Sequence, residues 1–162
     1  MCHPRVYGHI SDDRSPLRED YQPIQHESIF YVVARDEHDG GTDLLGLWLL
    51  VPENGVTAAI HTALLPCAWG PRGLEAARQL PAWIWHETPF RRIVTFVPTT
   101  NRLALAFAIR AGMKVFGVNE ASWLKNGVLC DMVCLGLSPG DRTDRNEAFD
   151  VSKLEELCPQ QW

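Results

Sequence analysis

The pattern of apolar and polar positions divides the chain into strand-like and helix-like stretches after an irregular beginning. Residues 1–28 show no sustained period and are rich in Pro, Asp, Arg and His, so we expect an irregular lead with one short helix. β-branched and aromatic runs follow at 29–34, 44–51 and 56–65, separated by turn-forming residues. This pattern predicts an antiparallel meander of three strands.

After residue 65 the spacing of apolar residues changes from a period of two to a period of about 3.6, which is typical of a helix. Apolar residues recur at helical spacing at four positions: Leu74, Ala77, Leu80 and Ile84. This spacing predicts a helix that runs through Trp85. Pro81 lies inside it and should bend or split the helix, because proline removes one backbone hydrogen bond.

A second strand-and-helix pair comes next. The apolar run 93–97 predicts a strand, and Asn101 is a candidate N-cap for a helix that ends at Gly112. Two more strands are expected at 115–118 and 128–137, around a turn at Asn126-Gly127. Strand, helix, strand, helix is the order of a βαβ unit.

The chain of 162 residues fits one domain. We expect that domain to span residues 1–137, including the irregular lead. Residues 138–162 are polar and form a C-terminal extension, in which the spacing of Ser152 and Glu155 fits a capping box and predicts a short helix.

The charge balance and the cysteines narrow the classes of partner. A net charge of −5 offers no general field for nucleic acid or an anionic membrane surface, so neither partner is expected. No apolar run approaches the roughly 20 residues of a membrane span, and residues 1–5 lack the apolar core of a signal peptide, so a cytoplasmic protein is expected. The five cysteines form no CxxC pair, which favours reduced, mostly buried thiols and no metal site.

The most informative segment joins the strand ending near Leu65 to the helix that follows Gly73. Gly70 and Gly73 flank Arg72 in a turn that leads into a helix N-terminus, where free N–H groups and the helix dipole favour an anion. Glycine-rich turns of this kind also serve packing alone. The segment matches neither a Walker loop nor a dinucleotide fingerprint. Any phosphate site would depend on Arg72, with Arg91 or Arg92, and on the helix N-terminus.

Several segments together resemble the GNAT (GCN5-related N-acetyltransferase) superfamily over residues 3–137. The matching segments are Ile60–Pro66, Trp69–Ala76, Asn101–Ala104, Ala111–Met113 and Asn126–Asp131. The resemblance implies an α/β (α+β) fold, with a mixed, mostly antiparallel sheet of six to seven strands flanked by helices. It also implies an acetyl-CoA-dependent N-acetyltransferase that acts on a primary amine of a protein or small molecule by direct attack on the thioester.

The resemblance assigns roles to several positions. The strand end at Ala63, Leu64 and Leu65 would pair with the pantetheine arm of acetyl-CoA, and Asn101 would contact the cofactor near its sulfur. The pyrophosphate would lie against one loop: Trp69, Gly70, Arg72, Gly73 and Leu74. Two departures stand out, because only Gly73 keeps the central glycine of the family's loop, and Ala108 replaces a tyrosine that many members use as an acid.

Two residues are candidates for the base that deprotonates the amine. His61 lies on the strand just before the acyl site, and imidazole titrates near neutral pH. Its structural alternative is a histidine that bonds a backbone carbonyl. Glu53 lies on the preceding turn, where exposed carboxylates usually have no role. Asp131 either orients an amine or pairs with a neighbouring cation.

The chain also resembles the GNAT-like proteins that tailed phages encode, some of which act in head assembly. This resemblance leaves a second function open, namely a catalytically silent assembly or adaptor protein. Residues 138–162 would then contact a phage or host protein. The protein would lie in the host cytoplasm or be associated with the virion.

Overall fold

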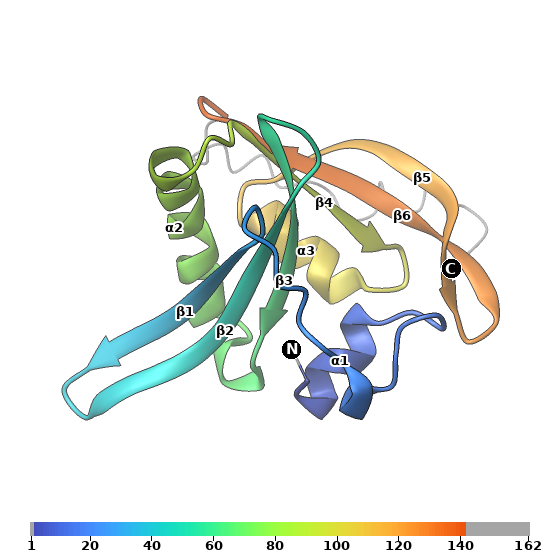
Figure 1. The fold of residues 1–162 in the computed structure, drawn as a ribbon, viewed down its shortest axis with the longest axis horizontal. Coiled ribbons are helices and arrows are strands. Elements are labelled where there is room, and N and C mark those ends of the chain that lie inside the picture. The colour runs from blue at the N-terminus through green and yellow to red at the C-terminus, as the bar shows by residue number, and fades with distance from the viewer. Residues whose placement is uncertain (1, 142–162) are drawn as a thin grey trace.

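The computed structural model describes residues 2–141. Six strands form one mixed sheet in the order β1-β2-β3-β4-β6-β5 (Figure 1). The strands are β1 (Phe30–His38), β2 (Gly41–Pro52), β3 (Thr57–Leu64), β4 (Arg92–Pro98), β5 (Lys114–Lys125) and β6 (Val128–Leu137). The helices are α1 (Pro4–Ile10), α2 (Pro71–Glu87) and α3 (Arg102–Arg110), with the short 3-10 helices η1 (Arg18–Asp20) and η2 (Pro66–Ala68).

The predicted meander and closing hairpin are confirmed, with longer strands than the apolar runs indicate. β1, β2 and β3 pair antiparallel in sequence. The turn between β5 and β6 is Asn126-Gly127, and both residues have positive φ, of 53° and 76°. Such a two-residue turn matches the twist of the strands that it joins.

β5 extends far beyond the predicted strand at 115–118. The prediction was too short because bulges interrupt the alternation of apolar and polar residues in this strand. Its register with β6 shifts between Val115 and Gly117 and again between Asn119 and Trp123. Extra residues in one strand break the period of two on which a sequence prediction depends. Asp131 holds the second bulge: its Oδ1 accepts a hydrogen bond from Ala121 N at 2.8 Å. Asp131 therefore has a structural role, through a backbone N–H and not through a cation.

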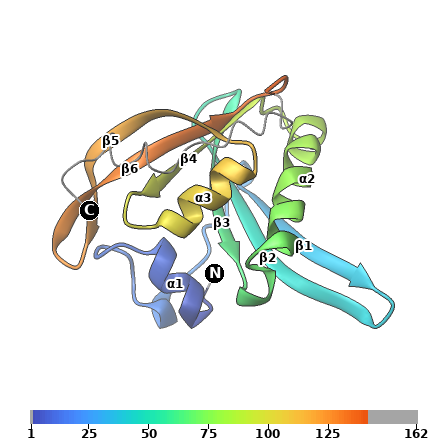
Figure 2. The same cartoon turned by 180° about the vertical axis from the view of Figure 1, so that it is seen from behind.

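Helices α2 and α3 cover one face of the sheet, as the view from behind shows (Figure 2). Alternate residues of β2 and β3 join α2 in the main hydrophobic core, where Leu50 and Ile84 are fully buried. A second cluster lies under α3 and contains Ala108. α2 continues without interruption through Pro81, which is buried in the core. Packing on the sheet thus holds the helix together despite the missing N–H.

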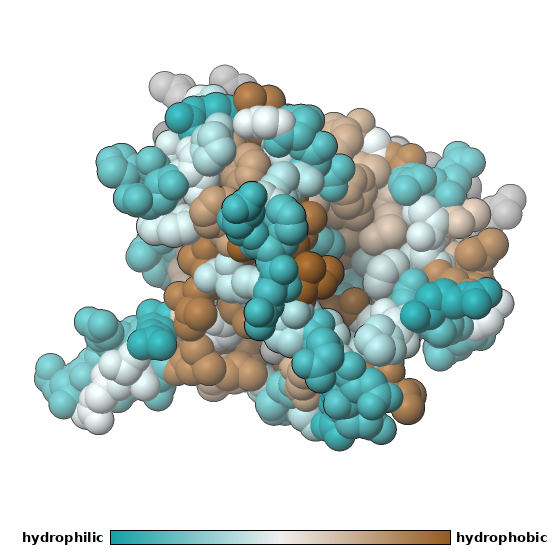
Figure 3. All heavy atoms as spheres, in the orientation of Figure 1, coloured by the Kyte–Doolittle hydropathy of each residue, from teal (hydrophilic) through white to brown (hydrophobic). Residues whose placement is uncertain are grey.

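The opposite face of the sheet carries α1 and the chain that leads to β1. On this face hydrophobic side chains lie in the middle, and hydrophilic ones lie at the periphery and along a central band (Figure 3). Val6 and Tyr7 of α1 are buried, and the Tyr7 hydroxyl donates to the carbonyl of Pro16. The predicted short helix in the lead is therefore present, and it anchors that lead to the domain.

Other predictions have mixed outcomes. Cys130 and Cys134 are buried, whereas Cys2 and Cys67 are exposed, so the prediction of mostly buried thiols is wrong for the first two cysteines. Cys2 precedes α1 near the start of the chain, and Cys67 lies in the short helix η2, both at the surface of the domain. The sheet ends at Leu137, and the capping box at 152–155 lies outside the described residues. Among residues 2–141, no helix is long and apolar enough to cross a membrane.

Candidate active site

β3 and β4 separate after a short parallel contact. Only three residue pairs join them: Thr57 with Arg92, Ala58 with Ile93, and Ala59 with Val94. Beyond Ala59 the two strands diverge, since β4 continues to pair with β6 and β3 with β2. The C-terminal half of β3 therefore has one edge without a neighbouring strand in the described sheet.

The backbone groups at this edge belong to the even-numbered residues of β3. Val56 O accepts hydrogen bonds from the N–H groups of Arg91 and Arg92 on the β4 side. Leu65 N–H donates instead to Leu45 O on the β2 side. Because N–H and C=O directions alternate along a strand, the peptide groups of Ile60, Thr62 and Leu64 face the gap.

This direction changes the residues expected to contact a pantetheine arm. The backbone groups of Ala63 and Leu65 face β2, so these two residues do not supply the free edge. The carbonyl of Leu64 accepts a hydrogen bond from the Trp69 indole at 3.0 Å, which leaves its N–H toward the gap. The sequence did not indicate that Ile60 and Thr62 have backbone groups on the free edge of β3. An apolar strand shows which side chains are buried, but not which backbone edge is paired.

The loop after β3 leads directly into α2. Gly70 is the N-cap of α2 and has a φ of 111°, a conformation that favours glycine. Pro71 has no N–H, so Arg72 and Gly73 carry the first-turn N–H groups that have no partner within the helix. Leu74 N–H donates to Gly70 O, and the Leu74 side chain packs on the main core.

Gly73 has a packing role in addition to its place at the helix N-terminus. A Cβ atom at this position would collide with the carbonyl oxygen of Ala68 and would lie 2.9 Å from Leu64 Cδ1. The absence of a side chain lets the first turn of α2 press against η2 and the end of β3. The packing interpretation of this glycine is therefore confirmed, and the anion interpretation stays a prediction.

Arg72 is bound to acidic residues of the β1–β2 hairpin. Its Nε donates to Asp36 Oδ2 at 2.9 Å, and its Nη2 donates to Asp43 Oδ2 at 2.8 Å. The guanidinium holds the pKa of Asp43 below its usual range. Two carboxylates more than balance one guanidinium, so Arg72 does not give this loop a net positive charge.

A different cation lies over the loop, on α1. The Arg5 guanidinium carbon lies 4.9 Å from the centre of the Trp69 ring, a cation–π distance. The His9 ring meets the same indole edge to face, with ring centres 6.4 Å apart. α1 therefore brings Arg5 and His9 next to Trp69, although more than fifty residues separate them in the chain.

Asn101 connects α1 to the end of β4. Its side chain caps α3 by accepting a hydrogen bond from Ala104 N at 3.2 Å, as predicted. Its Nδ2 donates to the carbonyl of His9 at 3.4 Å. Because β3 and β4 are parallel, the loops that follow them lie at the same end of the sheet, and α1 contacts both.

Arg91 and Arg92 lie at the wrong end of the sheet for a phosphate at Gly70. They begin β4, whose seven residues span about 20 Å, whereas the β3–α2 loop lies near its other end. Arg92 Nη1 donates to Ser138 Oγ, and its guanidinium stacks on Phe116. A phosphate held at Gly70 would therefore lie beyond the reach of these two arginines.

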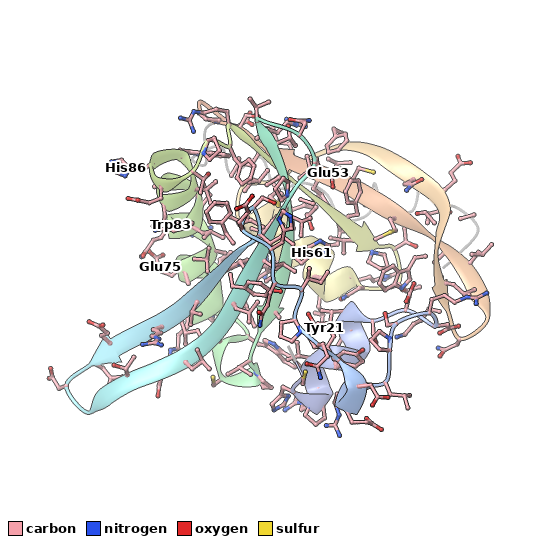
Figure 4. All side chains as sticks on the ribbon, viewed as in Figure 1. Tyr21, Glu53, His61, Glu75, Trp83 and His86 are labelled. Atoms are coloured by element: carbon pink, nitrogen blue, oxygen red, sulfur yellow. The ribbon has the colours of Figure 1, made fainter. Side chains whose placement is uncertain are left out.

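His61 projects from the face opposite α2. Ala58, Ile60 and Leu64 belong to the core with α2, so the odd-numbered residue His61 points the other way. Its side chain is exposed, yet the surrounding protein lowers its pKa below 6.5, while the Glu53 carboxylate acts in the opposite direction. Glu53 and His61 lie on neighbouring parts of the face seen in Figure 4. The lowered pKa favours the neutral imidazole, which is the form that can accept a proton.

No group of three or more His, Cys, Asp or Glu side chains within residues 2–141 is arranged to hold a metal ion. The arrangement instead offers a free backbone edge, a helix N-terminus and a neutral imidazole. These are groups that can hold an extended thioester and deprotonate an amine.

Comparison with known proteins gives the fold. No family model and no curated protein matches the chain. A chimera of spermidine N-acetyltransferase SpeG from Vibrio cholerae and hSSAT is 17% identical, with a TM-score of 0.60 over 68% of this chain and 67% of that chain. Ribosomal-protein-alanine N-acetyltransferase from Brucella melitensis is 14% identical, with a TM-score of 0.54 over 67% of this chain and 68% of that one.

A third neighbour was solved with ligands. The microcin C7 self-immunity acetyltransferase MccE, in complex with acetyl-CoA and AMP, is 22% identical, with a TM-score of 0.53 over 60% of this chain and 56% of that chain. The matched regions thus span 56–68% of these three proteins. The chain has the fold of the GNAT acetyltransferases, with a mixed six-stranded sheet flanked by three helices within residues 2–141.

Proposed function

We propose that the protein is an acetyl-CoA-dependent N-acetyltransferase that acts on a primary amine. The observation that carries the proposal is the divergence of β3 and β4 after Ala59, within a GNAT fold. This divergence leaves the peptide groups of Ile60 and Thr62 on an open edge that ends at the α2 N-terminus. An extended amide-containing arm can pair with such an edge as a further strand does.

Arg5 and the first turn of α2 would hold the phosphates of acetyl-CoA. Helix N-termini favour anions, and Arg5 lies over Trp69 in the same loop. We expect Arg5→Gln to weaken acetyl-CoA binding more than Arg72→Gln, because Arg72 is already compensated by Asp36 and Asp43. Titration calorimetry of the two variants measures the difference. Equal losses would contradict the role of Arg5.

His61 would remove the proton from the acceptor. A free amine has a pKa near 10.4 and is mostly protonated at pH 7, so a neutral imidazole beside it favours the attacking form. The nitrogen lone pair then attacks the thioester carbon and a C–N bond forms. The C–S bond breaks, and the nitrogen loses its second proton to solvent as the amide forms. The sulfur leaves with the C–S electron pair and takes a proton from solvent, because Ala108, a buried residue of α3, has none to give.

Two measurements test the proposal. Acetyl-CoA at 100 times its Kd should raise the free energy of unfolding by about 2.7 kcal/mol, which a thermal-shift experiment detects. Thiol release in the presence of a panel of primary amines then tests transfer. Absence of a thermal shift at millimolar acetyl-CoA would contradict binding, and a shift without thiol release would contradict catalysis.

The silent assembly or adaptor protein is the alternative function. The compensated charge of Arg72 and the buried Ala108 favour it, since both reduce the groups available for catalysis. A deletion of residues 138–162 that abolishes a complex with a phage or host protein, while the remaining chain stays folded, would support this alternative. Thiol release with an amine would contradict it.

A further inference from the structure

A pocket lies on the His61 face, between the β1–β2 part of the sheet and the chain that leads from α1 to β1. It is open to solvent on one side and has a volume of about 320 Å³. Figure 4 is viewed onto this face and labels Tyr21 and His61. Six side chains line the pocket: Cys2, Tyr21, Pro23, Gln25, Tyr31 and Leu47. No step described above uses this pocket.

The strand register brings the pocket close to His61. Tyr31 on β1 pairs with Leu49 on β2, and Leu49 pairs with His61 on β3. Directly paired residues point to the same face of a sheet, and neighbouring strands lie about 4.8 Å apart. The Tyr31 wall of the pocket is therefore two strand spacings, about 10 Å, from the His61 backbone.

The residues that line the pocket present aromatic rings and apolar surface, and none of them is an acidic or basic residue. The Tyr31 hydroxyl donates to the carbonyl of Ile24 at 2.7 Å, so its polar end is engaged with the backbone and its ring remains for the pocket. The Tyr21 ring packs edge to face on Tyr7, with centres 6.1 Å apart. Burial raises the pKa of Tyr21, which keeps its hydroxyl neutral.

This chemistry distinguishes between classes of amine. A polyamine carries further ammonium groups, and each needs a carboxylate or water when it is enclosed. No lining residue is acidic. An aromatic ring, in contrast, packs favourably on tyrosine rings and on Leu47.

We propose that this pocket receives the aromatic ring of a primary monoamine whose amine group lies at His61. The inference rests on the acetyl transfer proposed above and names its acceptor class. Burial of one aromatic ring should raise kcat/KM about 10- to 100-fold over the same amine without the ring.

The test compares three acceptors with the full chain: 2-phenylethylamine, ethylamine and spermidine. We expect 2-phenylethylamine to have the highest kcat/KM, by about 10- to 100-fold over ethylamine. Gln25→Trp places a large side chain in the pocket from an exposed position, so it should remove most of this preference without a cost in the core. The matched control is Gln79→Trp on the exposed surface of α2, which should leave the preference unchanged.

Direct binding separates this inference from the proposed function. Binding of 2-phenylethylamine to the wild-type chain and to Gln25→Trp is measured by calorimetry in the presence of CoA. Transfer to amines without an aromatic preference overturns the pocket assignment alone. Absence of thiol release with every amine, together with binding that Gln25→Trp abolishes, overturns the proposed transfer and supports the pocket. Absence of binding to the wild-type chain overturns the pocket assignment in either case.

Discussion

The two faces of β3 have different roles, because one packs in the hydrophobic core and the other presents His61. Toward α2, residues such as Ile60 pack in a continuous apolar core with Leu50 and Ile84. Toward α1, the same strand presents His61, an exposed imidazole beside short, buried alanines at 59 and 63. One strand therefore stabilises the domain with its even-numbered side chains and offers chemistry with an odd-numbered one.

The difference in covering explains how the surface around His61 remains exposed in a well-packed domain. Helices α2 and α3 cover one face with long apolar side chains, whereas the other face is covered by α1 and an irregular chain. The contacts of this covering are partly polar: Lys125 Nζ donates to the carbonyls of Gly8 and Ser11, and Asp13 accepts from the N–H groups of Asn126 and Gly127. Directional contacts hold the lead in place without filling the surface around His61.

The largest expected effect lies on the open face. We expect His61→Gln to lower kcat/KM for acetyl transfer about 10²- to 10⁴-fold, because it removes the base. Its free energy of unfolding should change little, since the side chain is exposed. His86→Gln on α2 is the matched control, because His86 is exposed and its label in Figure 4 lies on α2, away from β3. Equal activity of the His61 variant and the wild-type chain would assign His61 a structural role.

On the helix face the effect should appear in stability instead. Ile84 is completely buried, so Ile84→Ala should cost about 2–5 kcal/mol and Ile84→Val about 0.5–1.5 kcal/mol. Urea unfolding of the two variants measures this graded series. At a temperature where each variant is folded, kcat/KM should match that of the wild-type chain. A larger loss of activity than of folded protein would show that the two faces are coupled.

Asn101 tests the connection between the two faces, since it caps α3 and contacts α1. Asn101→Ala should cost about 1 kcal/mol of unfolding free energy through the lost cap. Asn101→Asp keeps an oxygen for the Ala104 N–H and removes the Nδ2 donor to His9. If Asn101→Asp binds acetyl-CoA as weakly as Asn101→Ala but unfolds like the wild-type chain, the amide group matters for binding beyond capping. Equal unfolding free energies of the two variants would contradict the capping role.

The smallest effect concerns pH. Partial desolvation by the surrounding protein lowers the pKa of His61 below 6.5, although its side chain is exposed. The acid limb of kcat/KM should therefore have its midpoint below 6.5, and Glu53→Gln should move it lower still. The unfolded chain takes up this proton at a higher pH than the folded chain, so the stability linked to His61 is present above 6.5 and decreases as pH falls toward the folded pKa. His61→Gln should remove this decrease in a pH series of urea unfolding. A midpoint above 6.5 would contradict the assignment.

Much of the fold was predictable because local patterns report local structure. The turn at Asn126-Gly127, the Asn101 cap and the helical spacing of Leu80 and Ile84 each depend on a few neighbouring residues. The extent of β5 was not predictable, since its bulges depend on pairing with β6 and on Asp131. The roles of Ala63 and Leu65 were misplaced for a related reason, because the free edge of β3 follows from strand register.

The sequence by itself determined the order of strands and helices, the apolar faces that form the core, and the place of His61 on the third strand. It did so because periodicity and turn chemistry act over short stretches of chain. Only the tertiary structure decided that Arg72 is bound to Asp36 and Asp43, that Arg5 lies over Trp69, and that Tyr31 lies in register with His61. These contacts join residues from distant parts of the chain, so the residues come together only when the sheet has formed.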